Sequence, residues 1–169
     1  MDSNIAQRGV GHILAKVTNC GLTYLRNGAD LRPHDTNIVA ALSDTERDMS
    51  FVQYGIGATD RLGSPADGDL RSVIGEVPQQ MQTVRTTTLN HILAKHGAAI
   101  ERIGYLNVDC EGHDFQVIRG LDLDRYRPAI ITIEADTPAD KSAVVAHLDG
   151  AGYEHKETLH RTLLFVRQE

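Results

Sequence analysis

The sequence of 169 residues is poor in cysteine and has no long apolar run. Its two cysteines, Cys20 and Cys110, are too few for a disulfide framework and fit a reducing compartment. No apolar run approaches the roughly 20 residues that a transmembrane helix needs. The first residues, MDSNIAQRGVG, lack the basic and apolar regions of a secretory signal. We therefore expect a cytoplasmic protein with no membrane partner.

The chain also has no excess of positive charge and lacks several common catalytic motifs. The chain has 17 basic and 23 acidic residues and a net charge of -6, which argues against a nucleic-acid partner. The absence of a G-x-S-x-G turn disfavours an α/β-hydrolase, and the absence of G-x-x-x-x-G-K-[ST] excludes a P-loop nucleotidase. No linker-like tract divides the chain, so we expect one domain over residues 1–169.

The residues that are present alternate between strand-like and helix-like segments. Apolar or alternating runs predict strands at 37–42, 48–54, 84–87, 103–108 and 128–134, and two further β segments within 155–166. Apolar residues at helical spacing predict helices at 13–17, 89–96, 113–119 and 140–152. The glycine-rich segment 55–78 is expected to be a long loop.

The pentapeptide HILAK occurs twice, at His12–Lys16 and at His91–Lys95. The residues that follow the two copies differ, so a duplicated domain is not indicated. Both copies consist largely of good helix formers, and each is predicted to lie in a short amphipathic helix.

Continuous apolar strands separated by helices predict an α/β fold with an open, doubly wound and mostly parallel sheet. In such sheets ligands bind beyond the carboxyl ends of the strands. These ends are expected at Leu42–Asp44, Asp109–Glu111 and Glu134–Asp136. Since the last two carry carboxylates at the rim, the functional site is predicted at this edge.

Four ionisable residues, Asp109, Glu111, His113 and Asp114, flank a predicted strand-to-helix turn at Gly112. Asp109 is the first residue after the apolar strand, so its carboxylate is expected to face the crevice. For Asp114 the favoured interpretation is structural, because acids are common in the first turn of a helix. Glu111 and His113 are either a turn residue and a solvated surface residue, or functional groups.

Two other kinds of site are less favoured at this turn. Aspartate, glutamate and histidine can bind metal ions, but no further ligand completes a recognised spacing, so no metal is predicted. Cys110 has acidic neighbours, which disfavour a reactive thiolate. We therefore expect Cys110 to be buried by packing.

The same part of the chain carries a more specific pattern. The stretch IGYLNVDCEGHDFQVIRGLDL, followed by RPAIITIEA, resembles the Asp-x-Glu-Gly and Pro-x-Ile-x-x-Glu segments of FkbM-type methyltransferases. NIVAALSDTERDMSFVQYG and VRTTTLNHILAKHG resemble upstream segments of that family, and AGYEHKE and RTLLFVR resemble its closing strands. The resemblance covers residues 37–167, approximately.

This resemblance implies a Rossmann-like class I methyltransferase sheet with an antiparallel C-terminal strand, and S-adenosylmethionine as cofactor. The implied reaction is methyl transfer to a hydroxyl of a small molecule or glycan. Asp109 would face the gap between cofactor and acceptor, and Glu111 or His113 would be the base. Ala41, Leu42 and Ser43 match the segment that would flank the adenine, and Glu134 would orient the acceptor.

The N-terminal part departs from the family pattern. The family's first strand, its glycine-rich cofactor turn and its second strand are not recognisable, and Gly9-Val10-Gly11 is a poor substitute. The expectation is an N-terminally truncated domain with an open edge beside the Asp109 strand. A rearranged N-terminus, a second copy in a homodimer or a partner chain would cover that edge. A catalytically inactive binding or assembly module is the alternative function.

Overall fold

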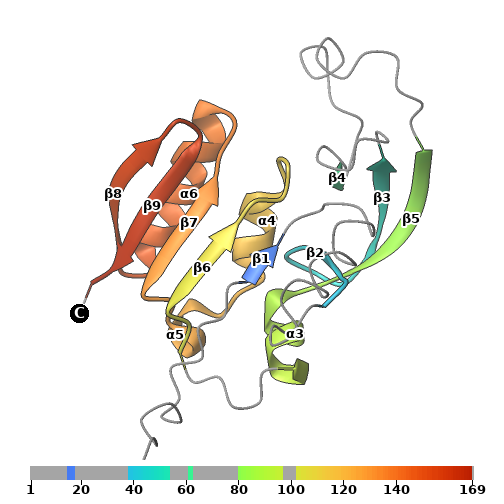
Figure 1. Ribbon diagram of the computed structural model, residues 1–169, viewed down its shortest axis with the longest axis horizontal. Coiled ribbons are helices and arrows are strands. Elements are labelled where there is room, and N and C mark those ends of the chain that lie inside the picture. Colours follow the sequence, from blue (N-terminus) through green and yellow to red (C-terminus); the bar gives the residue numbers. More distant parts are fainter. Residues whose placement is uncertain (1–14, 18–37, 54–60, 63–79, 97–101, 169) are drawn as a thin grey trace, which may run out of the picture.

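The computed structural model describes residues 15–17, 38–53, 61–62, 80–96 and 102–168, which form two β-sheets and four helices (Figure 1). The glycine pair at Gly9–Gly11 lies outside these residues. Most of the predicted loop 55–78 does too, although Arg61–Leu62 within it form strand β4.

The larger sheet contains five strands in the order β1-β6-β7-β9-β8. They are β1 (Ala15–Val17), β6 (Tyr105–Val108), β7 (Ile130–Glu134), β8 (Tyr153–Leu159) and β9 (Thr162–Arg167). β6 runs parallel to both of its neighbours, β1 and β7. β9 runs antiparallel to β7, as predicted for the C-terminal strand.

The smaller sheet has the order β2-β5-β3-β4 and lies at the right of Figure 1. Its strands are β2 (Ala41–Leu42), β5 (Gln80–Thr87), β3 (Asp48–Gln53) and β4 (Arg61–Leu62). β2 is parallel to β5, whereas β3 is antiparallel to both β5 and β4. The strand predicted at 37–42 is thus shorter than expected, and the one at 84–87 is longer.

The prediction of a mostly parallel sheet is not confirmed. Within the described ranges, three strand pairings are parallel and four are antiparallel. Burial alternates along β6, β7 and β9, so one face of the sheet is more deeply buried than the other. Ile130 on the less buried face is 39% exposed. The described residues therefore support a mixed α/β fold and do not establish a doubly wound one.

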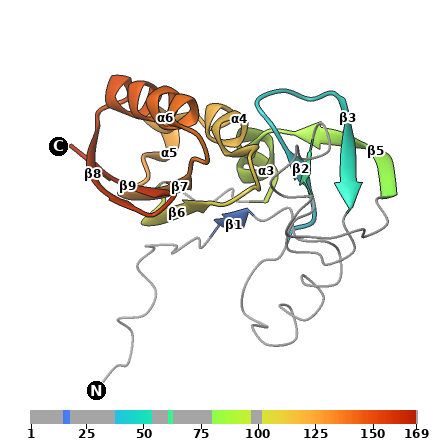
Figure 2. The ribbon, with the colours of Figure 1, turned by 90° about the horizontal axis from the view of Figure 1, so that it is seen from above.

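Four helices follow the strands: α3 (Leu89–His96), α4 (Asp114–Arg119), α5 (Leu123–Tyr126) and α6 (Pro138–Gly150). Figure 2 shows α4, α5 and α6 on one face of the five-stranded sheet. Thr137 begins α6 with a capping box shared with Asp140, and the short helix α5, which was not predicted, begins at the cap residue Asp122. No described helix is long and apolar enough to cross a bilayer.

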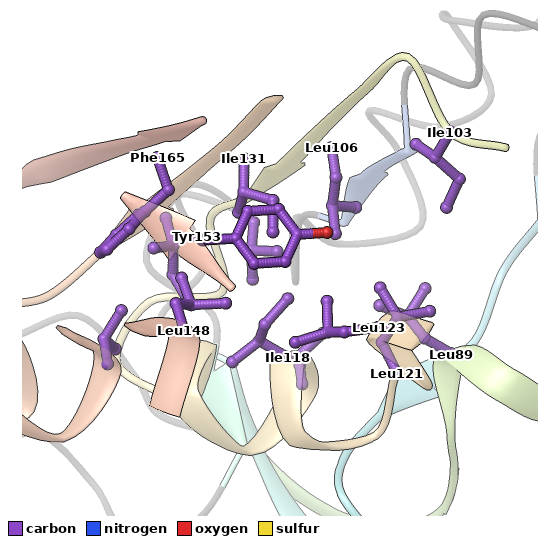
Figure 3. Close-up of a cluster of buried hydrophobic side chains, with 14 of the residues drawn as sticks. Leu89, Ile103, Leu106, Ile118, Leu121, Leu123, Ile131, Leu148, Tyr153 and Phe165 are labelled. Atoms are coloured by element: carbon purple, nitrogen blue, oxygen red, sulfur yellow. The ribbon is translucent and has the colours of Figure 1, made fainter. Parts of the chain in front are cut away.

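The hydrophobic core lies between this sheet and its helices (Figure 3). The sheet contributes every second residue of its strands, because alternate side chains point to the same face. These are Leu106, Val108, Ile131, Ile133, Leu163 and Phe165. The helices contribute residues at helical spacing, among them Val117, Ile118, Val144 and Leu148. Cys110 is fully buried in the same core, which confirms its predicted packing role.

Strand β1 corrects the prediction of a helix at residues 13–17. Ala15, Lys16 and Val17 pair in parallel with Leu106, Asn107 and Val108 of β6. The free backbone groups of β6 offer hydrogen bonds to any extended segment, and these outweigh a weak helix propensity. The N-terminal segment therefore covers the edge that was expected to be open. A homodimer or partner chain at the sheet stays a prediction.

His147 on α6 is half-buried against α4. Its ring meets Phe115 edge-on, with centroids 5.8 Å apart, and its buried Nε2 has no hydrogen-bond partner within the described part of the chain. Burial, and to a lesser degree the charge of Arg119, lowers the pKa of His147. The unfolded chain therefore binds this proton more readily than the folded chain does.

We expect the contribution of His147 to the free energy of unfolding to fall as the pH drops below about 6.5, where the unfolded histidine begins to take up its proton. The carboxyl groups with a raised pKa act in the opposite direction, so this contribution is measured as the difference between wild type and a His147 variant. Urea unfolding at neutral pH and at about pH 5 measures the loss. His147→Gln should reduce it, because the neutral amide has no proton to gain. The same change at the exposed His96 is the control and should leave the loss unaltered. An equal loss in both variants would contradict the assignment.

Candidate active site

The candidate site begins where β6 ends, at the carboxyl edge of the five-stranded sheet. Val108 is the last residue of β6 and is paired with Ile133 of β7. Asp109 therefore follows β6 at the level where Glu134 completes β7. Since both neighbours of β6 are parallel to it, this edge has the strand directions that were predicted for the ligand-binding crevice.

The turn after Asp109 has an unusual backbone. Glu111 has a φ of 52° and Gly112 a φ of 87°, so two consecutive residues are in the left-handed region. This region costs a residue with a side chain about 1 kcal/mol or more, whereas glycine adopts it freely. Asp114 supports the turn: its Oδ1 accepts a hydrogen bond from Cys110 N (2.8 Å), and its Oδ2 accepts one from Gly112 N (3.1 Å).

The negative charges of Asp109 and Glu134 both act on Glu111, and we call these three residues the acidic group. The pKa of Glu111 rises to about 7, chiefly through burial and then through the negative charges of Asp109 and Glu134. Burial also raises the pKa of Glu134, and Arg161 opposes that rise. A carboxyl that titrates near neutral pH exchanges protons readily under physiological conditions, which is the property of a general acid or base.

Two further charged residues adjoin this group: Asp136, which the sequence placed at the rim, and Arg161, which the sequence did not single out. Arg161, in the turn between β8 and β9, lies 3.2 Å from Glu134 and 2.8 Å from Asp136. The position of Asp136 can be predicted from the sequence, because it follows Glu134 at the strand end by two residues. The position of Arg161 cannot, since the antiparallel pairing of β7 with β9 brings it here from a distant part of the chain. The positive charge of Arg161 opposes the rise in the pKa of Glu134 and of Glu111.

His113 is held away from solvent and points toward a different part of the fold. It is 6% exposed, and its Nε2 lies 3.0 Å from Ser43 Oγ just beyond β2. Ser43 Oγ in turn donates to Asp44 Oδ1 at 3.2 Å. Because the serine has one hydroxyl proton, this arrangement fits a protonated Nε2 that donates to Ser43. The interpretation of His113 as a solvated surface residue is therefore wrong.

The predicted adenine-flanking segment occupies the end of β2. Ala41 is half-buried, whereas Leu42 and Ser43 are buried. Ser43 N donates to Thr87 O of β5, and Asp44 forms ion pairs with Arg47 and Arg119. His113 thus connects the end of β2 with the turn that follows β6. The connection links the two sheets, and neither sequence segment alone indicates it.

Asp114 is more deeply buried than a typical first-turn acid, with 4% exposure. Burial raises its pKa to about 7, against the opposing effect of the N–H groups of Cys110 and Gly112.

No cluster of three metal-ligating side chains is found in the described ranges. A surface cavity of about 440 Å³ lies between α6 and β8, and none of the predicted site residues lines it.

Comparison with known proteins identifies one related family. The family model described as "Methyltransferase FkbM domain" matches residues 22–163, which is most of the chain. No curated protein and no solved structure matches the sequence.

Proposed function

Since this chain belongs to the FkbM methyltransferase domain family, we propose that it transfers a methyl group from S-adenosylmethionine to an oxygen acceptor. The family match confirms the resemblance inferred from the motifs. The observation that carries the finer proposal is the acidic group formed by Asp109, Glu111 and Glu134 at the carboxyl edge of the sheet. In α/β folds this edge is where ligands bind.

The chemistry of these residues fits the cofactor. S-adenosylmethionine supplies a methyl group on a positively charged sulfur, and it carries a cationic amino group as well. Carboxylates at the end of β6 and β7 favour such cations. Asp109 is the residue we assign to the cofactor side, because it is the first to leave β6. Ala41, Leu42 and Ser43 are assigned to the adenine side, and His113 fixes Ser43 there.

Glu111 is the base in this proposal, and it is preferred to His113. Glu111 belongs to the acidic group and has a pKa of about 7, so at neutral pH about half of it is ready to accept a proton. His113 is buried, and its Nε2 is already engaged by Ser43. Glu111 would take the proton of the acceptor hydroxyl, while Glu134 would hold a second hydroxyl and so orient the acceptor.

The charge of the site limits the acceptor. The site has four carboxyl groups, those of Asp109, Glu111, Glu134 and Asp136, and the guanidinium of Arg161 forms ion pairs with the last two of them. Such an edge disfavours phosphorylated or carboxylated acceptors by like-charge repulsion. It favours neutral hydroxyl compounds, since carboxylates accept hydrogen bonds from hydroxyl groups. A small polyhydroxylated molecule or a glycan fits this requirement.

Calorimetry with S-adenosylmethionine and S-adenosylhomocysteine tests the cofactor assignment through Asp109→Ala. The first ligand carries the sulfonium charge, whereas the second is neutral at sulfur. We expect Asp109→Ala to weaken binding of S-adenosylmethionine about tenfold, as for a lost contact to a charged group, and to weaken S-adenosylhomocysteine less. The melting temperature should hardly change, because Asp109 is neither in the core nor in a strand.

The outcome also separates an enzyme from the alternative function. If the wild-type chain binds neither ligand at millimolar concentration, the cofactor assignment is rejected and an inactive binding or assembly module is favoured. If both ligands bind and Asp109→Ala alters neither affinity, the family function stands but Asp109 is not the cofactor-side residue.

A further inference from the structure

Asp114 differs from an ordinary helix-initiating acid in the direction of its hydrogen bonds. A first-turn carboxylate normally serves the free N–H groups of its own helix. The carboxyl of Asp114 interacts with its own N–H, but its two oxygens also reach backwards, to Cys110 N at 2.8 Å and to Gly112 N at 3.1 Å. One donor belongs to the residue before Glu111 and the other to the residue after it, so the carboxylate spans Glu111 and is bonded directly to the peptide unit that follows it.

The backbone of Glu111 needs such support. Its φ of 52° is unfavourable for a residue with a side chain, and the next residue, Gly112, is left-handed too with a φ of 87°. A residue of this kind persists where its surroundings over-determine the conformation. The buried carboxylate of Asp114, 4% exposed, is the side chain that does so here.

We propose that Asp114 is a positioning residue, which holds the Glu111 carboxylate beside Asp109 and Glu134 through the N–H groups of Cys110 and Gly112. The inference rests on the proposed function only in giving Glu111 a catalytic task. Without the bridge, Glu111 returns to an ordinary backbone conformation, and its side chain leaves the acidic group. Asp114 then acts on the reaction through Glu111 and touches neither cofactor nor acceptor.

The titration of Glu111 measures its position directly and needs no acceptor. Carbon-13 NMR of the side-chain carboxyl should give a wild-type pKa of about 7, because the group is half-buried beside Asp109 and Glu134. In Asp114→Asn the amide keeps one acceptor but turns an NH₂ group toward the second N–H. We expect the Glu111 pKa to fall by about one unit or more toward 4.5 as the carboxyl moves into water.

A control and a second variant make the test decisive. Asp122→Asn makes the same substitution at the start of α5, where the side chain accepts from Asp124 N and Arg125 N, and it should leave Glu111 unaltered. Gly112→Ala disturbs the same turn at an exposed position without removing a charge, and it should lower the Glu111 pKa as Asp114→Asn does. It also covers the case in which Asp114→Asn does not fold.

An unchanged Glu111 titration in a folded Asp114→Asn or Gly112→Ala variant would overturn the inference. Calorimetry with S-adenosylhomocysteine on the same samples keeps the two proposals distinct. Positioning through Glu111 predicts an affinity within about twofold of wild type, since the cofactor side is assigned to Asp109. If wild type binds no cofactor at all, the proposed function fails, whereas the titration still decides the role of Asp114.

Discussion

Gly120→Ala is expected to destabilise the fold by about 3 kcal/mol, because no space exists for the added methyl group. A Cβ on Gly120 would lie 2.5 Å from the carbonyl oxygen of Ser43 and 3.2 Å from that of Val117. Both atoms belong to the backbone and cannot rotate away. The end of α4 would have to separate from the end of β2, and Ser43 would move relative to His113.

The measurement is urea unfolding of Gly120→Ala beside Gly150→Ala. Gly150 ends α6, and a Cβ there would meet nothing within 4 Å. The control should be stabilised by about 0.5–1 kcal/mol, since alanine favours the helix over glycine. If glycine-to-alanine substitution lowers the free energy of unfolding at Gly120 and raises it at Gly150, the contact of the end of α4 with the end of β2 is closely packed. A Gly120→Ala variant as stable as wild type would contradict this packing.

Local sequence was sufficient to predict a helix or strand where the tertiary contacts of the segment favour the same structure as its residues do. The helix predicted at 89–96 is α3, and the strand predicted at 48–54 is β3. The two HILAK segments show the limit. Ala94 and Lys95 end the second copy inside α3, whereas Ala15 and Lys16 end the first copy inside β1. Pairing with the edge of β6 makes the end of the first copy a strand, and β6 lies more than 80 residues further along the sequence.

In the candidate site, too, only part of the arrangement could be predicted from local sequence. The proximity of Asp109 and Glu134 follows from two consecutive apolar strands, because parallel strands end at the same edge. The contact of His113 with Ser43 spans 70 residues, and Arg161 arrives through the antiparallel β7–β9 pair. Neither could be predicted from spacing. The backward hydrogen bonds of Asp114 were missed because first-turn acids usually have an ordinary role.

Glu111→Gln is expected to make the protein more stable at pH 8 and less active at the same time. Ionised Glu111 is half-buried beside Asp109 and Glu134, which raises its pKa from 4.5 to about 7. The folded chain therefore binds this proton more tightly than the unfolded chain does, and stability falls as the pH rises from 4.5 to 7. Glutamine has no charge to desolvate, so it removes this loss.

The expected gain at pH 8 is about 1–2 kcal/mol, which allows for partial exposure of the group to solvent. It should shrink toward pH 4, where the wild-type carboxyl is protonated in both states. Chemical unfolding at the two pH values gives the difference. Methyl transfer by the same variant should fall about 100-fold, because a positioned base contributes at least that much.

Glu154→Gln is the matched control for this pair of effects. Glu154 on β8 is exposed, and its contact with Lys156 lowers its pKa instead of raising it. Its substitution should not stabilise the chain at pH 8 and should leave transfer unchanged. If Glu111→Gln lowers stability at pH 8, favourable contacts of ionised Glu111 outweigh its burial and the repulsion from Asp109 and Glu134. A stabilised and fully active variant would instead remove Glu111 from catalysis, because a base cannot be replaced by a neutral amide without loss of rate.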